Sequence, residues 1–215
     1  MNFGWESNYL GNVGNYPAQG LIRAVRGEYP KKGILDIRDK KVLDIGCGDG
    51  RNSEFLRSEG GEVFGIEISS EVIELAQHRY PKVNFRKGTN KDLPFSDGLF
   101  DLIVSWNSCY YMQDKGDLFS DHLVEFKRVM RGSESLALFS IPQPSNFIYK
   151  QAKTLTLLEN YQIVEIAQDP FGIRVGQLMT QFSSMEALQK ELSLLREQIK
   201  GLPQNSVVIQ DAKAD

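Results

Sequence analysis

The strongest constraint on the fold is an alternation of short apolar runs and amphipathic segments that begins at Lys41. Five apolar runs have the length of strands: KVLDIG, EVFGIEI, VNFRKG, FDLIVSW and SLALFSIP. Three segments with helical spacing lie among them: NSEFLRSEGG, SSEVIELAQHRYP and DLFSDHLVEFKRVMRG. Asn52 or Ser53 is the expected cap of the first helix, and a serine caps the second. Because strands that alternate with helices form βαβ units, we predict an α/β fold. Its doubly wound, mainly parallel sheet is of the seven-stranded type, with helices on both faces and an antiparallel last strand.

Three glycines follow the first predicted strand at alternate positions: Gly46, Gly48 and Gly50. Glycine tolerates positive φ and lets a ligand approach the backbone without meeting a Cβ. In an open parallel sheet, the ligand crevice lies beyond the carboxyl ends of the strands. The following helix also offers unpaired N–H groups. The spacing therefore predicts a ligand-binding loop rather than a plain turn.

The residues around this loop narrow the class of ligand. A triphosphate-binding loop needs Lys and then Ser or Thr after its last glycine, but Arg51 and Asn52 follow here. A dinucleotide-binding loop needs GxGxxG, whereas this spacing is GxGxG and Arg51 fills the place of the third glycine. Glu67, at the end of the second predicted strand, can accept both hydroxyl protons of a ribose. We therefore predict a nucleoside ligand without a pyrophosphate.

Four segments together resemble the class I methyltransferases that use S-adenosylmethionine. VLDIGCGDG matches the first motif of that family, and VFGIEIS matches its second strand and acidic residue. LPFSDGLFDLIVSW matches the segment leading into the fourth strand, and EFKRVMRGS the helix and turn before the fifth. The resemblance covers roughly Val42 to Ile141. It implies a methyltransferase with S-adenosylmethionine as cofactor and S-adenosylhomocysteine as product.

The resemblance also implies cofactor-binding roles at the matching positions. Asp44 would hold the amino group of the cofactor, directly or through water, and Asn107 would contact its methionine end. Glu67 would accept the ribose hydroxyls, and Ile68 would flank the adenine. The backbone of the glycine loop would lie against the methionine part: Gly46, Cys47, Gly48 and Gly50.

Two further pairs of residues complete the predicted site. Family members often have Asp four residues before the Leu of LPF, where it binds the adenine amino group. This chain has Thr89 there, and Asn90 or Asp92 is an alternative partner. Methyl transfer from a sulfonium depends largely on positioning and desolvation, so no catalytic triad is expected. Tyr110 and Tyr111 are the candidate catalytic, acceptor-facing residues; alternatively, both only pack beneath a lid.

We predict a single domain with four parts. Residues 1–33 form a cap segment rich in Gly and aromatics, residues 34–141 the cofactor-binding core, and residues 142–183 an insertion or lid. Residues 184–215 form a C-terminal helix, capped by Ser184, and a last strand, NSVVIQDA. YQIVEIAQ and FGIRVGQLMTQF are predicted as two β segments around the turn DPFG. The aromatics of the cap segment either close over the sulfonium through cation–π attraction or form an apolar packing face: Trp5, Tyr9 and Tyr16.

The charge and composition of the chain indicate which partners it can bind. The net charge is −3 and the pI about 5.6, without the concentrated basic face that nucleic-acid binding needs. Nucleic acid is therefore an unlikely partner, and a small-molecule methyl acceptor is favoured. Two cysteines and two histidines give no metal site. With no signal peptide and no apolar run of membrane-spanning length, we predict a cytoplasmic monomer or homodimer that does not associate with membranes. An RNA or protein methyltransferase and a non-catalytic S-adenosylmethionine-binding protein stay open as alternatives.

Overall fold

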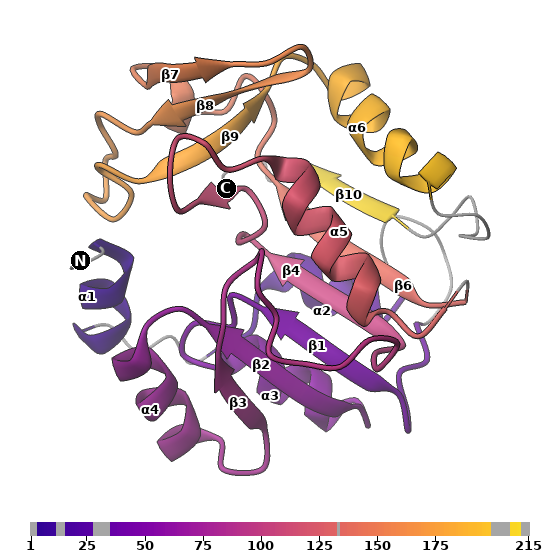
Figure 1. The fold of residues 1–215 in the computed structure, drawn as a ribbon. Helices are drawn as coiled ribbons and strands as arrows, with labels where there is room; N and C mark the ends of the chain where they lie inside the picture. Colours follow the sequence, from indigo (N-terminus) through magenta and orange to yellow (C-terminus); the bar gives the residue numbers. More distant parts are fainter. Residues whose placement is uncertain (1–3, 12–15, 28–34, 133, 199–206, 212–215) are drawn as a thin grey trace.

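A six-stranded sheet forms the centre of the molecule (Figure 1). The computed structural model describes residues 4–11, 16–27, 35–132, 134–198 and 207–211. The strand order is β10-β6-β4-β1-β2-β3, and all five neighbour pairings are parallel. The strands are β1 (Lys41–Ile45), β2 (Glu62–Glu67), β3 (Asn84–Lys87), β4 (Leu102–Trp106), β6 (Leu136–Ile141) and β10 (Val207–Asp211). The predicted doubly wound, mainly parallel fold is therefore confirmed.

The prediction of an antiparallel last strand is wrong. β10 pairs in parallel with β6, with Val207 opposite Ala137. A helix, α6 (Met185–Gln198), precedes β10 in the chain. The connection from β6 to β10 spans residues 142–206 and contains this helix, and a long connection of this kind permits parallel pairing, whereas a tight hairpin would have made the pair antiparallel. The described part of the sheet has six strands, one fewer than the seven-stranded type.

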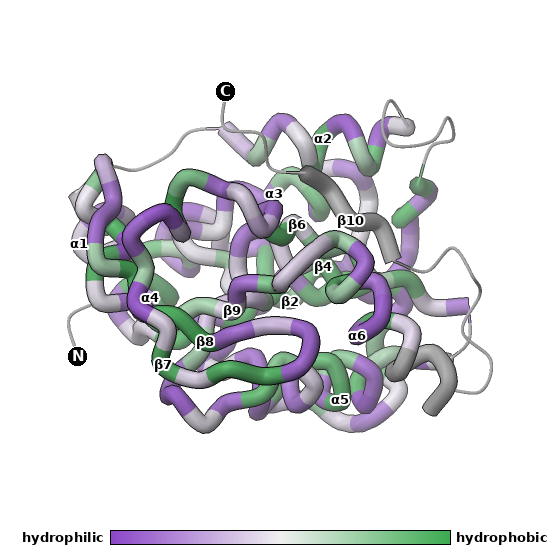
Figure 2. The backbone as a smooth tube through the Cα atoms, turned by 90° about the horizontal axis from the view of Figure 1, so that it is seen from above, coloured by the Kyte–Doolittle hydropathy of each residue, from purple (hydrophilic) through white to green (hydrophobic). Residues whose placement is uncertain are grey.

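Helices cover both faces of the sheet because successive strand residues point to opposite sides. On one face, Val42 and Leu102 join a buried apolar cluster with α2 (Gln19–Val25), α3 (Arg51–Ser58) and α4 (Ser70–Arg79). On the other face, Leu43 and Ile103 join a second cluster with α5 (Phe119–Val129) and α6. In Figure 2 much of α5 and of the strands between the helices is coloured as hydrophobic. Among the helices of the described residues, none has both the length and the hydropathy to cross a bilayer.

The predicted cap of α3 is wrong, while the predicted caps of α4 and α6 are confirmed. The chain enters α3 directly from Gly50, whose φ of +83° is left-handed. Asn52 and Ser53 lie inside the helix and are buried. In α4 the Oγ of Ser69 accepts the N–H of Val72 at 3.2 Å, as expected of a serine cap. In α6 the Oγ of Ser184 likewise accepts the N–H of Ala187 at 3.0 Å.

A second, antiparallel sheet lies above the carboxyl ends of the parallel strands (Figure 1). Its order is β5-β9-β8-β7. The strands are β5 (Tyr111–Met112), β7 (Lys153–Leu157), β8 (Tyr161–Glu165) and β9 (Leu178–Phe182), and a short 3₁₀ helix, η1 (Phe147–Tyr149), precedes β7. YQIVEIAQ was predicted correctly as a strand. FGIRVGQLMTQF was predicted only in part, because its first half is a turn in which Gly172 and Gly176 have positive φ.

Four elements of the structure were not predicted. They are β5, β7, the 3₁₀ helix η1 and the first helix, α1 (Gly4–Gly11). Figure 1 shows α1 at the edge of the molecule, beside α4 and below the turn that joins β8 to β9. α1 packs against α4, and the Oγ of Ser69 donates to Glu6 at 2.8 Å. The cap segment is thus attached to the parallel sheet's own helix layer.

Candidate functional site

The candidate site lies where the strand order reverses. After β3 the chain crosses to the other side of β1, so the carboxyl ends of β1 and β4 border the crevice in which α/β proteins bind ligands. Two loops meet there, residues 46–50 after β1 and residues 107–111 after β4. A Cβ built on Gly46 would lie only 1.9 Å from the Oγ of Ser108. The φ of Gly46 is +66°. Glycine is therefore required here by both the turn and the approach of the second loop.

The other two glycines of the loop face different neighbours. A Cβ on Gly48 would lie 2.6 Å from the ring carbon Cζ of Tyr9, which comes from α1. A Cβ on Gly50 would lie 2.7 Å from the ring of Phe85, on β3. Gly48 thus makes room at the surface of the loop, where a ligand or an aromatic ring can lie. Gly50 serves the packing between the loop and β3.

Glu67 ends β2 with a carboxylate that is buried but not saturated. One oxygen, Oε1, accepts the N–H of Ile68 at 2.6 Å, and the other, Oε2, accepts the N–H of Gly48 at 3.2 Å. Burial raises the pKa of this carboxyl, and the backbone N–H groups oppose that shift. A third backbone N–H, that of Ser69, also donates to this carboxylate, so one of the four accepting positions of its two oxygens remains. That position can accept a ribose hydroxyl.

Asp44 and Cys47 lie at the base of the loop. Asp44 is fully buried at the end of β1, and its Oδ2 accepts the hydroxyl of Ser53 at 2.6 Å. Burial raises the pKa of Asp44 to about 6, against the opposing effect of the Ser53 hydrogen bond. Cys47 places its side chain in the apolar cluster beneath the loop, and its N–H donates to Ile66 at 2.9 Å. Its carbonyl accepts the N–H of Gly50 at 3.1 Å, so Cys47 holds the loop in shape through its backbone.

Asn90 joins the loop after β3 to the loop after β4. Its Nδ2 donates to the carbonyl of Ser108 at 3.2 Å and to that of Tyr111 at 3.5 Å. Thr89 and Asp92 form a tight backbone bridge, with both N–H groups donating across it at 3.2 Å. Thr89 and Asn90 are both half-buried beside the crevice. The structure thus brings the predicted adenine side into direct contact with the 107–111 loop.

Asn107 begins that loop in an unusual conformation. Its φ is +59°, a left-handed value that non-glycine residues adopt rarely and asparagine most readily. Its side-chain Oδ1 accepts the hydroxyl of Ser140, on β6, at 2.9 Å. This contact spans two neighbouring strand ends, β4 and β6. It holds the exposed Asn107 at the rim of the crevice.

The two candidate tyrosines are stacked but lie in different surroundings. Their ring centroids are 5.0 Å apart, with 25° between the planes. Tyr110 is only 3% exposed and belongs to the apolar core, where burial raises its pKa well above the usual value. Tyr111 is half-buried, and its hydroxyl contacts the guanidinium of Arg174. Tyr111 is therefore the one of the two that reaches the rim of the site.

Several residues of the site were missed or only partly recognised. Asp49 is fully buried and accepts Arg51 at 2.8 Å and Arg79 at 2.7 Å. The guanidinium of Arg51 lies 5.6 Å from the centre of the Tyr9 ring. A charged pair inside a glycine loop was a local signal for this network. Ser108 and Arg174 had no comparable signal, because their neighbours are distant in the sequence.

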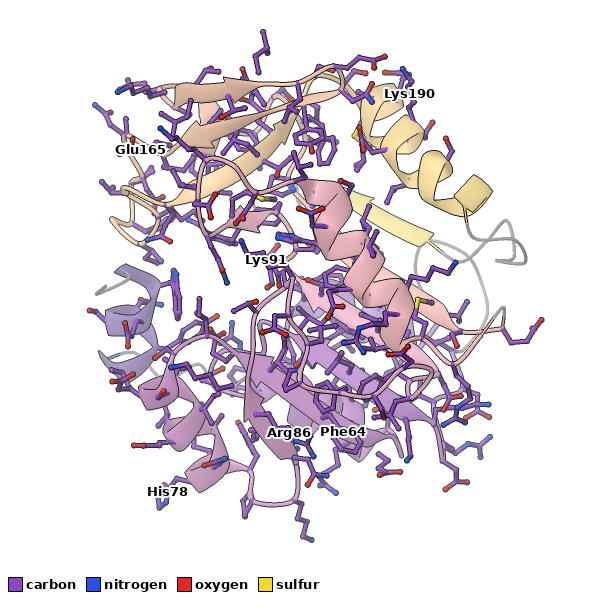
Figure 3. The ribbon with its side chains drawn as sticks, viewed as in Figure 1. Phe64, His78, Arg86, Lys91, Glu165 and Lys190 are labelled. Atoms are coloured by element: carbon purple, nitrogen blue, oxygen red, sulfur yellow. The ribbon has the colours of Figure 1, made fainter. Side chains whose placement is uncertain are left out.

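The histidines and the second cysteine lie outside this arrangement. His78 is exposed on the outer side of α4 (Figure 3). His122 is buried in α5, and its Nδ1 is 2.9 Å from the carbonyl of Cys109. Burial raises the pKa of the Cys109 thiol to about 12, so it is not a thiolate nucleophile. Within the described ranges, no group of three or more His, Cys, Asp or Glu residues is placed to hold a metal ion.

Lys91 connects the lower and upper parts of the molecule. Figure 3 shows it between the two sheets, above Phe64 and Arg86 on the parallel sheet. Its ammonium group pairs with Asp117, which precedes α5. The Asp117 carboxylate also accepts the N–H of Gln113 at 2.6 Å. The segment between β5 and α5 is thereby tied to the loop after β3.

Comparison with known proteins gives one family and a consistent fold. Residues 42–132 match the family described as "Methyltransferase domain". The chloroplastic tocopherol O-methyltransferase of Arabidopsis thaliana is 35% identical over 121 residues, 51% of this chain and 34% of that protein. The demethylmenaquinone methyltransferase of Chlorobaculum parvum is 24% identical over 145 residues, 67% of this chain and 58% of that protein. The chain thus spans between a third and three fifths of the length of these curated relatives.

A solved structure supports the same fold over most of the chain. It is a methyltransferase of Thermotoga maritima described as SAM-dependent and possibly a histamine N-methyltransferase. Its TM-score is 0.58 at 20% identity, covering 89% of this chain and 75% of that one. At this identity the similarity concerns the fold.

Proposed function

We propose that this chain, whose residues 42–132 match the methyltransferase family, is an S-adenosylmethionine-dependent methyltransferase of class I and that it methylates a small molecule. The cofactor of that family is S-adenosylmethionine, which supplies a methyl group already activated on a sulfonium. The protein then has to bind the cofactor, align an acceptor with the methyl carbon and exclude water. None of these tasks requires a catalytic triad.

The observation that carries the proposal is the combination of the crevice and Glu67. Two loops approach within contact distance at the switch point, between Gly46 and Ser108. Beside them the buried carboxylate of Glu67 accepts the N–H groups of Ile68, Gly48 and Ser69 and keeps one accepting position. A ribose hydroxyl of a nucleoside can donate to that position.

Further residues are assigned to the cofactor as part of the same proposal. Asp44 attracts the amino group of the cofactor when it is ionised, and Asn107 lies at the methionine end. Ile68 flanks the adenine. Thr89 and Asn90 line its far side, although the amide of Asn90 is already engaged with the 107–111 loop. The glycine loop contributes backbone through Gly46, Cys47 and Gly48, while Gly50 supports it by packing on Phe85.

The acceptor side is assigned to the antiparallel sheet, the 107–111 loop and α1. Tyr111 is the proposed acceptor-facing residue, and Tyr110 positions it through ring stacking. Tyr9 covers the loop at Gly48 and is held by Arg51, consistent with a cover over the sulfonium. The names of the two curated relatives, which act on tocopherol and demethylmenaquinone, support a small-molecule acceptor. A cytoplasmic location and a lid formed by residues 142–183 belong to the same proposal.

Cofactor binding is tested by calorimetry with S-adenosylhomocysteine. We expect a one-to-one complex, and a folded protein that does not bind would overturn the proposal. Catalysis is tested by offering methyl-labelled S-adenosylmethionine with a metabolite extract, and separately with total RNA and with total protein. Label in small molecules supports the proposal, whereas label only in RNA or protein contradicts its acceptor class. Binding without any transfer indicates a non-catalytic protein.

A further inference from the structure

The turn between β8 and β9, residues 169–177, is built around a buried carboxylate. The side chain of Asp169 is 0% exposed. Its Oδ2 accepts the N–H of Ile173 at 2.9 Å and that of Arg174 at 3.0 Å. The turn is closed by the N–H of Gln177, which donates to the carbonyl of Arg174 at 2.9 Å. The backbone at Arg174 is therefore fixed by the turn itself.

The guanidinium of Arg174 is held but not saturated. Its Nη1 lies 3.2 Å and 3.3 Å from the two oxygens of Asp169, and it also contacts the hydroxyl of Tyr111. A guanidinium carries five N–H donors. Within the described residues these contacts use at most three of them. The side chain is 28% exposed, so its free donors can be reached from outside.

Arg174 lies above the crevice rather than at a remote surface. Its partner Tyr111 belongs to the loop of Ser108, since the N–H of Tyr111 donates to the Ser108 carbonyl at 3.0 Å. Ser108 in turn covers Gly46. On its other side the 169–177 turn meets α1, because a Cβ on Gly4 would lie 2.6 Å from the carbonyl oxygen of Ile173. Arg174 therefore lies between α1 and the 107–111 loop, at the rim of the site.

From this geometry we propose that Arg174 binds a carboxylate of the methyl acceptor, which is therefore a small carboxylic acid. The proposal rests on the function proposed above and names the substrate class of that site. A planar guanidinium with free donors is suited to bind a carboxylate. Asp169 fixes the orientation of Arg174, and the hydroxyl of Tyr111 borders the bound group. A neutral amide of the same shape lacks the charge that this site recognises.

The test uses benzoate as the carboxylate probe and benzamide as its neutral counterpart. The Nε–H signal of Arg174 is followed by NMR in the full chain saturated with S-adenosylhomocysteine, at constant ionic strength. We expect a saturable shift with benzoate, in the millimolar range that one such pair supports, and none with benzamide. Arg174→Lys should weaken benzoate binding, followed through nearby backbone amides, by about tenfold, because a single ammonium replaces the fork.

A matched control distinguishes binding at Arg174 from nonspecific attraction of benzoate to positive charge. Arg38→Met removes an exposed arginine that is paired with Asp36, and it should leave benzoate binding unchanged. The proposal is overturned if wild-type protein gives no saturable shift with benzoate, or if benzamide binds equally well. It is also overturned if Arg174→Lys binds benzoate as tightly as wild type. Binding of S-adenosylhomocysteine is measured in every sample, so failure of the cofactor site is distinguished from failure of the carboxylate site.

Discussion

The two sides of the crevice are built in different ways. The lower side, here the floor, consists of the 46–50 loop with Asp44 and Glu67 on consecutive parallel strands. Several of its contacts join residues within about twenty positions of each other, such as Gly48 and Glu67. The upper side, the ceiling, consists of α1, Tyr111 and the 169–177 turn, which are brought together from the whole length of the chain. The floor is a rigid, buried template, and the ceiling is an assembly of surface segments.

The largest expected effect is on the floor, at Gly46. In Gly46→Ala the new Cβ meets Ser108 at 1.9 Å in a backbone with φ of +66°. We expect a loss of about 3 kcal/mol or more in the free energy of unfolding, measured by urea titration. Adding Ser108→Gly should recover part of it, since the Cβ of Ser108 is also within 2.5 Å. Gly132→Ala, which meets no atom within 4 Å, is the matched control. If Gly46→Ala had the same free energy of unfolding as wild type, the close approach of the two loops would be contradicted.

The next effect concerns Asp44, whose pKa is raised from 3.8 to about 6 by burial. Because the folded-state pKa lies above the unfolded one, ionisation opposes folding. The penalty is absent below about pH 4 and complete above about pH 6. Asp44→Asn should therefore be about 3 kcal/mol more stable than wild type at pH 8, with no gain near pH 3.

The same variant should bind S-adenosylhomocysteine more weakly at pH 8, and wild-type affinity should fall as the pH is lowered through about 6. Asp36→Asn, at an exposed carboxylate, serves as the control for both measurements. If Asp44→Asn were less stable than wild type at pH 8, the ionised Asp44 carboxylate would be stabilising the folded state, which contradicts the prediction.

Glu67→Gln should reduce the affinity for S-adenosylhomocysteine by about 30-fold, or about 2 kcal/mol, because charged acceptors are replaced by a neutral amide. Calorimetry at pH 8 measures the change. Glu62→Gln, at the exposed start of the same strand, should have no effect on affinity. Equal affinities for the two variants would place the ribose elsewhere.

The smallest effect is expected where floor and ceiling meet, at Tyr9. Tyr9→Ala removes a ring that lies over Gly48 and beside Arg51, and it should weaken cofactor binding by about 0.5–1 kcal/mol. Tyr9→Phe keeps the ring and should stay close to wild type. Tyr16→Ala, at a tyrosine that is 83% exposed, is the control. A loss of affinity in Tyr9→Phe as large as in Tyr9→Ala would assign the effect to the hydroxyl instead.

The same difference explains how far the sequence could predict the molecule. Apart from β5, the strands and helices from β1 to β6 follow local periodicity, and Glu67 and the glycine loop are recognisable from their positions at strand ends. β5 could not be predicted, since it is a two-residue strand defined by pairing Tyr111 with Met179. The role of Arg174 could not be predicted, because it depends on a contact with Tyr111, 63 positions earlier in the chain. It also depends on a turn in which Gly172 and Gly176 have positive φ, where a strand was predicted. The direction of β10 could not be predicted either, because a helix followed by a strand is compatible with parallel and with antiparallel pairing.

The two cysteines have a practical consequence for following the motion of the crevice. The chain has two cysteines, both are buried, and one lies in each of the loops that meet at the switch point. Because burial raises the pKa of both thiols, reagents modify them only when the surrounding loop opens to solvent. Each sulfur is therefore an intrinsic label for its own loop. Comparing their alkylation rates, with and without S-adenosylhomocysteine, would reveal which side of the entrance opens first.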